Sequence, residues 1–255
     1  MKKNDWIPMP RFLLRKNALM KIFKQMELTS SNCLEFGFGA GDYLKYFASK
    51  GANVTGFDFS KAAVEIAKQR IDGFEYSKNI SFAENIDELK EESFDIVLAC
   101  EVLEHIENDI ETLDHWMSYL KPGGSLIISV PAHMSKWNES DVWAGHYKRY
   151  EKNELLDYSK SRNLELKSLW NYGFPLSLVL DKLLGASKKA EVANFDESTD
   201  KAELSKNSGV DRKNRFIYRL LSNDLALFPF YFFQRMFFNF DLGSGYILHL
   251  KKNEK

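Results

Sequence analysis

Short apolar runs alternate with longer amphipathic segments from Asn32 to about Asn171. This alternation is typical of parallel strands joined by crossover helices. Most of the runs are too short for helices and are bounded by Gly, Asp or Pro. The expected strands are Cys33–Phe36, Val54–Asp58, Ile80–Ala83, Phe94–Cys100, Ser125–Val130 and Leu164–Trp170, with a closing strand at Gly245–Leu250. We therefore predict an α/β fold with a mostly parallel sheet.

Helix signals lie between the strands. Asp42–Ser49 begins with Asp42, which we expect to cap the helix after the glycines, and Lys61–Arg70 follows Ser60, another good capping residue. Asp109–Leu120 ends at the helix-stopping residues Lys-Pro-Gly-Gly. Before the first strand, Arg11–Met26 has apolar residues at helical spacing. We expect this N-terminal helix to cover part of the sheet or the site.

The pattern changes after Trp170. An apolar stretch, Phe174–Leu184, is followed by the polar segment 186–214, which predicts a mobile loop. Phe216–Phe240 is rich in aromatics but interrupted by charges and a proline, so it does not predict a bilayer span. The predicted organisation is an N-terminal helical segment (1–31), a core (32–173), a helical and aromatic insertion or lid (174–243) and a final strand with a tail (244–255).

Composition excludes several function classes. The 255 residues are 44% hydrophobic, enough to fill a core, and 35 basic against 36 acidic residues leave a net charge of −1. Such a balance offers no field for nucleic acid, so no nucleic-acid partner is expected. Two cysteines and the absence of Cys/His spacing motifs predict neither a disulfide framework nor a metal site. The start of the chain lacks the apolar core of a signal peptide, so a cytoplasmic location is expected.

The candidate chemistry begins at the end of the first strand. Glu35 is followed by Gly37, Gly39 and Gly41, before a predicted helix. Glycines at this point of an open α/β sheet take positive φ and let a ligand lie against the main chain. A nicotinamide fingerprint would need glycine at 42, where Asp42 stands. A carboxylate at Glu35 instead suits a cationic ligand; a plain tight turn is the alternative.

Three further strand ends extend this site. Asp58 ends the second strand about 20 residues on, where an acid can accept both ribose hydroxyls, although capping of the next helix is an alternative. The third strand ends near Glu84, Asn85 and Ile86, which would bracket an adenine ring. The fourth runs from a buried strand into a loop. Together the four ends outline an adenosine pocket.

With these residues in view, the sequence resembles the class I methyltransferases that use S-adenosylmethionine. The residues that carry the resemblance are the glycine turn Glu35–Gly41, Asp58 within Phe57–Ser60, Phe94–His105 (FDIVLACEVLEH) and Leu120–Gly124 (LKPGG). The resemblance covers roughly Asn32 to Trp170. It implies a Rossmann-like, doubly wound, mostly parallel seven-stranded sheet with an antiparallel last strand.

The same resemblance assigns roles. It implies S-adenosylmethionine as cofactor and S-adenosylhomocysteine as product, with Asp58 on the ribose, the glycine turn at the methionine end and Glu101 and Val102 beside the methyl group. Phe59, next to Asp58, is added to the cofactor-binding residues. Asp141–Tyr150 looks like the GH-x-R-R-Y signature of a bacterial subgroup acting on small molecules, with Lys148 in place of the first Arg. Asn85 stands where an acid is common, which leaves the adenine contact open.

Methyl transfer requires an aligned nucleophile, exclusion of water and, for some acceptors, a base. His146, His133 and His105 are the candidate bases, each with a structural alternative, since imidazole titrates near neutral pH. Trp143, Tyr147 and Arg149 belong to the same polar and aromatic cluster as His146 and are candidate acceptor-binding residues.

The leading hypothesis is a methyltransferase that acts at oxygen or nitrogen of a small-molecule, sugar or lipid-like acceptor. The alternative is a non-catalytic cofactor-binding scaffold or partner-binding protein. The aromatic segment Phe216–Phe240 is compatible with peripheral membrane contact and with a homodimer. We favour amphipathic helices that cap the sheet or form a dimer interface over a lid or a wall of the acceptor site.

Overall fold

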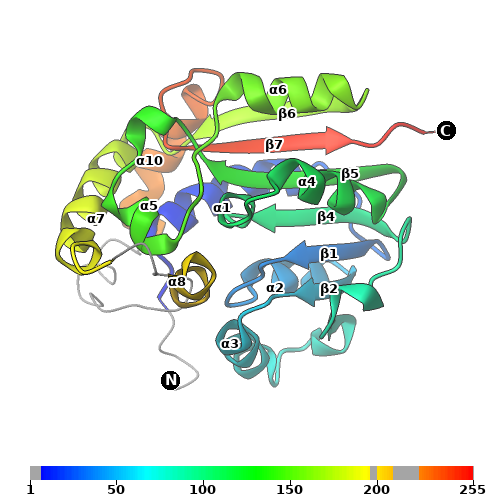
Figure 1. Ribbon diagram of the computed structural model, residues 1–255. Helices are drawn as coiled ribbons and strands as arrows, with labels where there is room; N and C mark the ends of the chain where they lie inside the picture. The colour runs from blue at the N-terminus through cyan, green and yellow to red at the C-terminus, as the bar shows by residue number, and fades with distance from the viewer. Residues whose placement is uncertain (1–6, 196–199, 209–223, 255) are drawn as a thin grey trace.

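The computed structural model describes residues 7–195, 200–208 and 224–254. One seven-stranded sheet forms its centre, in the order β3-β2-β1-β4-β5-β7-β6 (Figure 1). The strands are β1 (Asn32–Phe36), β2 (Asn53–Phe57), β3 (Ile80–Phe82), β4 (Phe94–Cys100), β5 (Leu120–Pro131), β6 (Glu165–Tyr172) and β7 (Gly245–Lys251). β7 lies between β5 and β6 and is antiparallel to both, whereas β3, β2, β1, β4 and β5 are parallel. The predicted fold class is confirmed.

Helices follow the strands as the amphipathic segments predicted. They are α1 (Pro10–Phe23), α2 (Asp42–Ser49), α3 (Lys61–Ile71), α4 (Asp109–Ser118), α5 (Glu139–Ala144), α6 (Lys152–Ser161), α7 (Leu176–Val192), α8 (Lys201–Ser208) and α10 (Asp224–Met236), with short 3-10 turns η1 (Ser77–Asn79), η2 (Ile86–Glu88), η3 (Leu103–His105) and η4 (Met134–Lys136). The Lys-Pro-Gly-Gly stop ends α4 as expected, but these residues belong to an extension of β5 with an irregular register.

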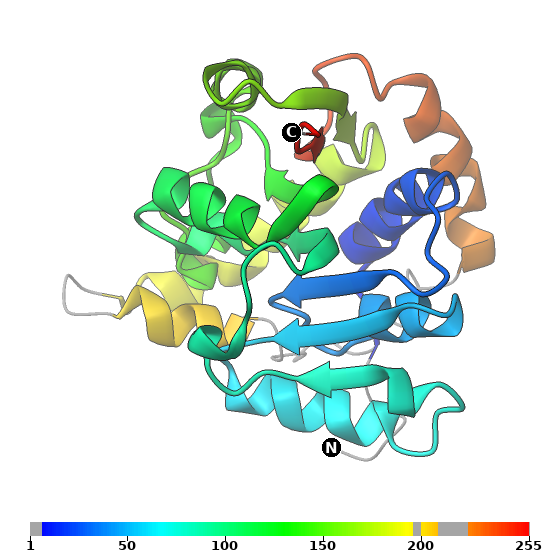
Figure 2. The ribbon, with the colours of Figure 1, turned by 90° about the vertical axis from the view of Figure 1, so that its right-hand side faces the viewer.

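Two apolar cores lie on the two faces of the sheet. One combines the apolar stripes of α1 and α2 with inward residues of β1 and β4, such as Leu14, Phe47 and Leu98. The other combines α4 and α6 with the opposite faces of the strands, including Trp116 and Leu155. Figure 2 shows α1 between the sheet and α10, so the N-terminal helix is buried on two sides. Cys33 and Cys100 are free and buried within these layers.

The insertion between β6 and β7 differs from the sequence prediction. The sequence predicts a loop over 186–214, but 186–192 continue α7 and 201–208 form α8, while 196–199 and 209–214 lie outside the described residues. The polar side chains that suggested a loop lie largely on exposed helix faces. α7 packs against α5, and α10 packs against α1. The aromatic segment is helical over 224–236, while 216–223 lie outside the described residues.

The carboxyl ends of the parallel strands meet at one edge of the sheet, beside α5 and α8 (Figure 1). This is the edge at which open α/β sheets bind ligands. Within the described ranges, no helix is long and apolar enough to cross a membrane.

Candidate functional site

The glycine turn after β1 has the backbone shape that the sequence predicted. Gly37, Gly39 and Gly41 have φ values of 63°, 52° and 76°, in the left-handed region that favours glycine. A Cβ on Gly37 would lie 2.4 Å from Val102 Cγ2, whereas a Cβ on Gly39 would meet no described atom within 4 Å. The turn is therefore packed at Gly37 and open at Gly39, which leaves space for a ligand against the backbone.

Asp58 holds this turn from the end of β2. Its Oδ2 accepts a hydrogen bond from the Gly39 N–H at 3.0 Å, and its Oδ1 accepts one from the Ser60 N–H at 2.8 Å. Burial raises its pKa, against the lowering effect of these two bonds. Ser60 caps α3 as expected, but Asp42 is no cap: the N-cap of α2 is Gly41, and Asp42 pairs with Arg70 at 2.7 Å.

Glu35 is more deeply buried than its sequence role suggested. It is 2% exposed, and its Oε2 has no hydrogen-bond partner among the described residues. Burial raises the pKa of Glu35 well above its usual range, and the nearby carboxylates of Asp42 and Asp58 raise it further. The group is thus held toward its neutral form unless a cation comes close.

The third strand end contributes less than expected. Glu84 and Asn85 are exposed, and the Asn85 side chain caps η2 in a capping box with Glu88. Ile86 is half-buried and packs against the core that contains Trp116 and Leu155. Asn85 is therefore already engaged, which leaves Ile86 as the member of this group best suited to an apolar ring face. Phe59, which follows Asp58, is 47% exposed.

At the end of β4, Glu101 is held by two arginines of α1. Arg15 Nη1 lies 3.5 Å from Glu101 Oε1, and Arg11 Nη2 lies 3.7 Å from Oε2. Ser129 and Tyr172 donate hydrogen bonds to the same Oε1, at 3.0 and 3.3 Å. Burial would raise the pKa of Glu101, but Arg15 and Arg11 outweigh it and lower the pKa. Glu101 is therefore a fixed carboxylate beside two cations.

A second buried ionic group fixes His146. Arg149 is fully buried and donates to both oxygens of Asp141, through Nε at 2.9 and 3.0 Å and Nη2 at 2.8 Å. Asp141 Oδ1 also lies 2.9 Å from His146 Nδ1. Burial would raise the pKa of Asp141, but hydrogen bonds from His146 and Arg149 lower it to about 2. The structure thus makes Arg149 a support for Asp141, not the acceptor-binding residue that its position in the motif suggested.

Glu104 and His105 in η3 face His146. The Tyr147 N–H donates to the Glu104 carbonyl at 2.7 Å, which joins η3 to the loop after α5. The rings of His105 and His146 lie edge to face, with centroids 4.7 Å apart. Burial and the nearby Glu101 raise the pKa of Glu104, while burial and His146 lower that of His105 to about 3. A carboxylate oxygen of Glu104 and one ring nitrogen each of His105 and His146 lie within 4.8 Å of one another. The sequence spacing did not predict this cluster of three possible metal ligands.

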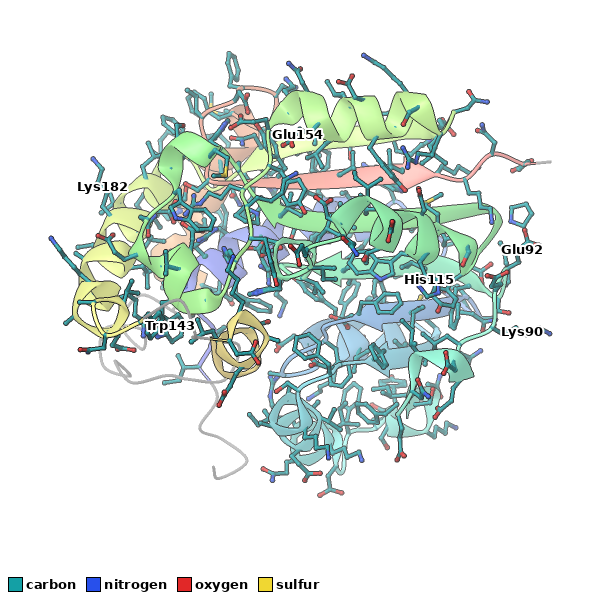
Figure 3. All side chains as sticks on the ribbon, viewed as in Figure 1. Lys90, Glu92, His115, Trp143, Glu154 and Lys182 are labelled. Atoms are coloured by element: carbon teal, nitrogen blue, oxygen red, sulfur yellow. The ribbon has the colours of Figure 1, made fainter. Side chains whose placement is uncertain are left out.

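The other two acceptor-binding candidates lie under the insertion. Trp143 Nε1 donates to Glu191 at 2.8 Å, and its ring centroid lies 3.5 Å from Lys188 Nζ, so α7 covers it. Lys201 of α8 lies over the Tyr147 ring, with Nζ 4.1 Å from the centroid. Figure 3 shows Trp143 at the end of the molecule where α5 and α8 lie. Both rings therefore lie beside the strand ends, where α7 covers Trp143 and α8 covers Tyr147.

His133 stands apart from the other two histidines. Its φ is 66°, and its ring nitrogens lie 3.4 Å from Glu151 Oε2 and 3.4 Å from Asp241 Oδ1. Its ring also packs edge to face on Tyr246. These contacts place His133 on the β7 side of the sheet edge, so the structure brings together His105 and His146 but not His133.

Sequence reasoning missed four site residues. Arg11 and Arg15 were treated as part of an amphipathic helix, and their chemistry shows only once α1 is packed over β4. Asp141 is a neighbour of His146 in the sequence, and the five-residue spacing across the turn at Gly145 is a usable signal for their contact. Glu104 belongs to a loop motif in the sequence, but in the structure it is fully buried, and its carbonyl accepts a hydrogen bond from the Tyr147 N–H in the loop after α5.

Three comparisons with known proteins bear on this site. A family model described as a methyltransferase domain matches residues 10–176. A ubiquinone biosynthesis O-methyltransferase of Coxiella burnetii is 30% identical over 123 residues, which cover 47% of this chain and 52% of that protein. The chain therefore matches about half the length of this curated relative.

Solved structures agree at the level of the fold. A methyltransferase-like protein of Bacillus halodurans aligns with a TM-score of 0.61 at 15% identity, covering 94% of this chain and 99% of that chain. Phosphoethanolamine N-methyltransferase 2 of Haemonchus contortus, solved with S-adenosyl-L-methionine, aligns with a TM-score of 0.59 at 17% identity, covering 94% of this chain and 53% of that chain. At these identities the likeness shows a shared architecture.

Proposed function

The chain belongs to the methyltransferase-domain family, and on that basis we propose that it transfers the methyl group of S-adenosylmethionine to an oxygen or nitrogen of a small-molecule acceptor. The observation that carries the proposal is the glycine turn, which is packed at Gly37, open at Gly39 and pinned by Asp58. A turn of this kind at a strand end suits a nucleoside ligand.

The donor groups around the turn suit the cofactor. Each oxygen of Asp58 accepts one backbone hydrogen bond and keeps a lone pair for a ribose hydroxyl. Glu35 has an unpartnered oxygen in a buried position, which a positively charged ligand would stabilise in its ionised form. Arg15 Nε and Arg11 Nη2 are buried donors without a hydrogen-bond partner among the described residues, and they suit the cofactor carboxylate. Val102 packs on Gly37 and would wall the methionine end.

The cofactor supplies a methyl group on a cationic sulfur that leaves as a neutral thioether. The chain's own contribution is to align the acceptor and remove its proton. We assign the base role to His146: Asp141 holds its Nδ1, which leaves Nε2 to take the proton of an acceptor hydroxyl or ammonium. The Asp141 carboxylate then stabilises the imidazolium. Trp143 and Tyr147 would exclude water from this side.

The acceptor class follows from a second surface. Large apolar side chains are exposed along α10 and just beyond it: Leu225, Phe228, Phe232, Phe233, Met236, Phe240 and Leu242. Two exposed cations lie nearby: Arg235 is on α10, and Lys21 Nζ lies 5.9 Å from the ring centroid of Phe238, which follows α10. An apolar face bordered by cations suits the surface of an anionic bilayer. We infer a lipid-like acceptor, met at a membrane surface.

The test of the function is binding followed by turnover. Calorimetry should show that S-adenosylhomocysteine binds the wild-type chain and that Asp58→Ala abolishes binding. Incubation with S-adenosylmethionine and a metabolite and lipid extract should then produce S-adenosylhomocysteine, and His146→Ala should lower turnover far more than cofactor affinity. Tight binding without turnover across broad acceptors would favour the scaffold alternative, and unchanged affinity in Asp58→Ala would remove Asp58 from the ribose.

A further inference from the structure

Three potential metal ligands converge beside the strand ends. Glu104 and His105 come from η3, and His146 comes from the loop after α5. A hydrogen bond from the Tyr147 N–H to the Glu104 carbonyl joins this loop to η3. His146 Nε2 lies 3.9 Å from Glu104 Oε1, and ligand atoms of all three residues can be selected within 4.8 Å of one another. Metal ions bind such groups at about 2.0–2.2 Å, so small side-chain rotations would close the site.

Glu104 is the strongest sign that something belongs there. Its side chain is 0% exposed, and neither carboxylate oxygen has a hydrogen-bond partner among the described residues. A buried carboxyl group without partners is unfavourable, and natural proteins pair such groups or use them to bind metals. Among the described residues, Arg11 and Arg15 form ion pairs with Glu101, and Arg11 also with Asp181, but neither forms one with Glu104.

His146 is held in the way that metal-binding histidines usually are, and His105 offers a buried nitrogen. His146 Nδ1 lies 2.9 Å from Asp141 Oδ1, and this carboxylate favours the tautomer with the proton on Nδ1, which leaves the lone pair on Nε2, 3.9 Å from Glu104 Oε1. Arg149 in turn fixes Asp141 from a fully buried position. This carboxylate-to-histidine support is the usual arrangement behind a metal-bound imidazole. His105 Nδ1 is buried and has no hydrogen-bond partner in the described part of the chain.

We propose that Glu104, His105 and His146 bind a divalent first-row transition-metal ion. Two imidazole nitrogens and one carboxylate favour ions such as Zn²⁺ or Mn²⁺ over Mg²⁺ and Ca²⁺, which prefer oxygen ligands. Three protein ligands leave coordination positions open for water or a substrate oxygen.

The use of this ion rests on the proposed function. An acceptor hydroxyl bound to the ion loses its proton to solvent, and its oxygen then forms the bond to the methyl carbon as the carbon–sulfur bond breaks. The lone pair of His146 Nε2 holds either the proton or the ion. In the loaded protein the ion therefore takes over the activation that His146 provides alone in the metal-free protein.

The experiment uses the full chain, freed of metal with a chelator and dialysed. Calorimetric titration with ZnCl₂ should show one site per chain, MgCl₂ should bind far more weakly, and CoCl₂ should give visible absorption bands. Glu104→Gln and His105→Asn should each weaken zinc binding by more than the roughly 10–100-fold that loss of an outer partner causes. Glu104→Gln removes a buried charge and should fold, which thermal unfolding checks.

His115→Asn is the matched control, because His115 is exposed on α4 and lies far from Trp143 (Figure 3). Its zinc affinity should equal that of the wild type. Absence of zinc binding, or wild-type affinity in both Glu104→Gln and His105→Asn, overturns the proposal. Titration of the same samples with S-adenosylhomocysteine separates the two claims: a chain that binds the nucleoside but no zinc refutes the metal site alone, and the reverse refutes the proposed function alone.

Discussion

A single methyl group at Gly39 should separate cofactor binding from folding. Gly39 has a φ of 52°, and a Cβ built there meets no described atom within 4 Å. Gly39→Ala therefore costs the folded protein the strain of a left-handed alanine, roughly 1–2 kcal/mol, and no clash. The new methyl group occupies the space in which the cofactor would lie against the backbone.

The magnitudes follow from these two effects. For a chain of this size, 1 kcal/mol lowers the melting temperature by about 2–4 °C, so Gly39→Ala should melt roughly 2–8 °C below the wild type. A methyl group forced against a bound ligand costs about 1–3 kcal/mol, which weakens binding by roughly 5–150-fold. The wild type at 100 times its dissociation constant should gain about 2.7 kcal/mol from the ligand, and the variant should lose much of that gain.

The assay is thermal unfolding with and without S-adenosylhomocysteine, together with calorimetry. Gly123→Ala is the control, since Gly123 has a φ of 76° and its added Cβ would meet the Glu254 side chain at 3.3 Å, close to the start of β5. This variant should lose similar stability but keep the full ligand-induced rise. If Gly39→Ala binds the ligand as tightly as Gly123→Ala does, the open side of the glycine turn is not the cofactor site.

Three further outcomes are expected. Arg149→Met should lower the free energy of unfolding by about 3–5 kcal/mol, because it leaves the buried Asp141 carboxylate without its main partner. Arg162→Met, which breaks the half-exposed pair with Asp114, should lower it by at most about 1 kcal/mol. Equal losses for the two variants in urea denaturation would contradict this prediction. Burial lowers the pKa of His249 from 6.5 to about 4. As the pH falls, the unfolded chain therefore binds a proton at His249 before the folded chain does. The free energy of unfolding should decrease between pH 6.5 and pH 4, by at most about 3 kcal/mol from this group. His249→Gln should flatten the stability profile in that window, and an unchanged slope would exclude His249 as its source. The wild type should float with anionic phosphatidylglycerol vesicles, and the double variant Phe228→Ser with Phe232→Ser should not, although it keeps its affinity for S-adenosylhomocysteine. If the wild type does not float but dimerises as its concentration rises, the exposed face of α10 binds a second copy of the chain instead.

The sequence sufficed for the sheet and for the glycine turn. Strand patterning and helix stops are local signals, and the positive φ of Gly37 and Gly39 was predictable because these glycines lie in a turn between a strand and a helix. The loop predicted over 186–214 was wrong where 186–192 and 201–208 are helical, because polar composition describes an exposed helix face as well as a loop.

Side-chain roles needed the tertiary structure. Arg149 reads as a site residue in its motif, yet its full burial against Asp141 depends on how α5 folds back. Arg15 reads as the polar side of a helix, and its pairing with Glu101 depends on α1 crossing the end of β4. Long-range pairs of this kind leave no local pattern in a single sequence. The cofactor roles of Asp58 and Glu35 and the base role of His146 stay predictions.

The most direct test of the central claim is a crystal structure of the chain with S-adenosylhomocysteine. The account predicts the ribose at Asp58, the backbone of Gly39 against the ligand, and the homocysteine end toward Arg15 and Glu101. Density for the ligand at another place in the fold, with the glycine turn empty, would contradict it.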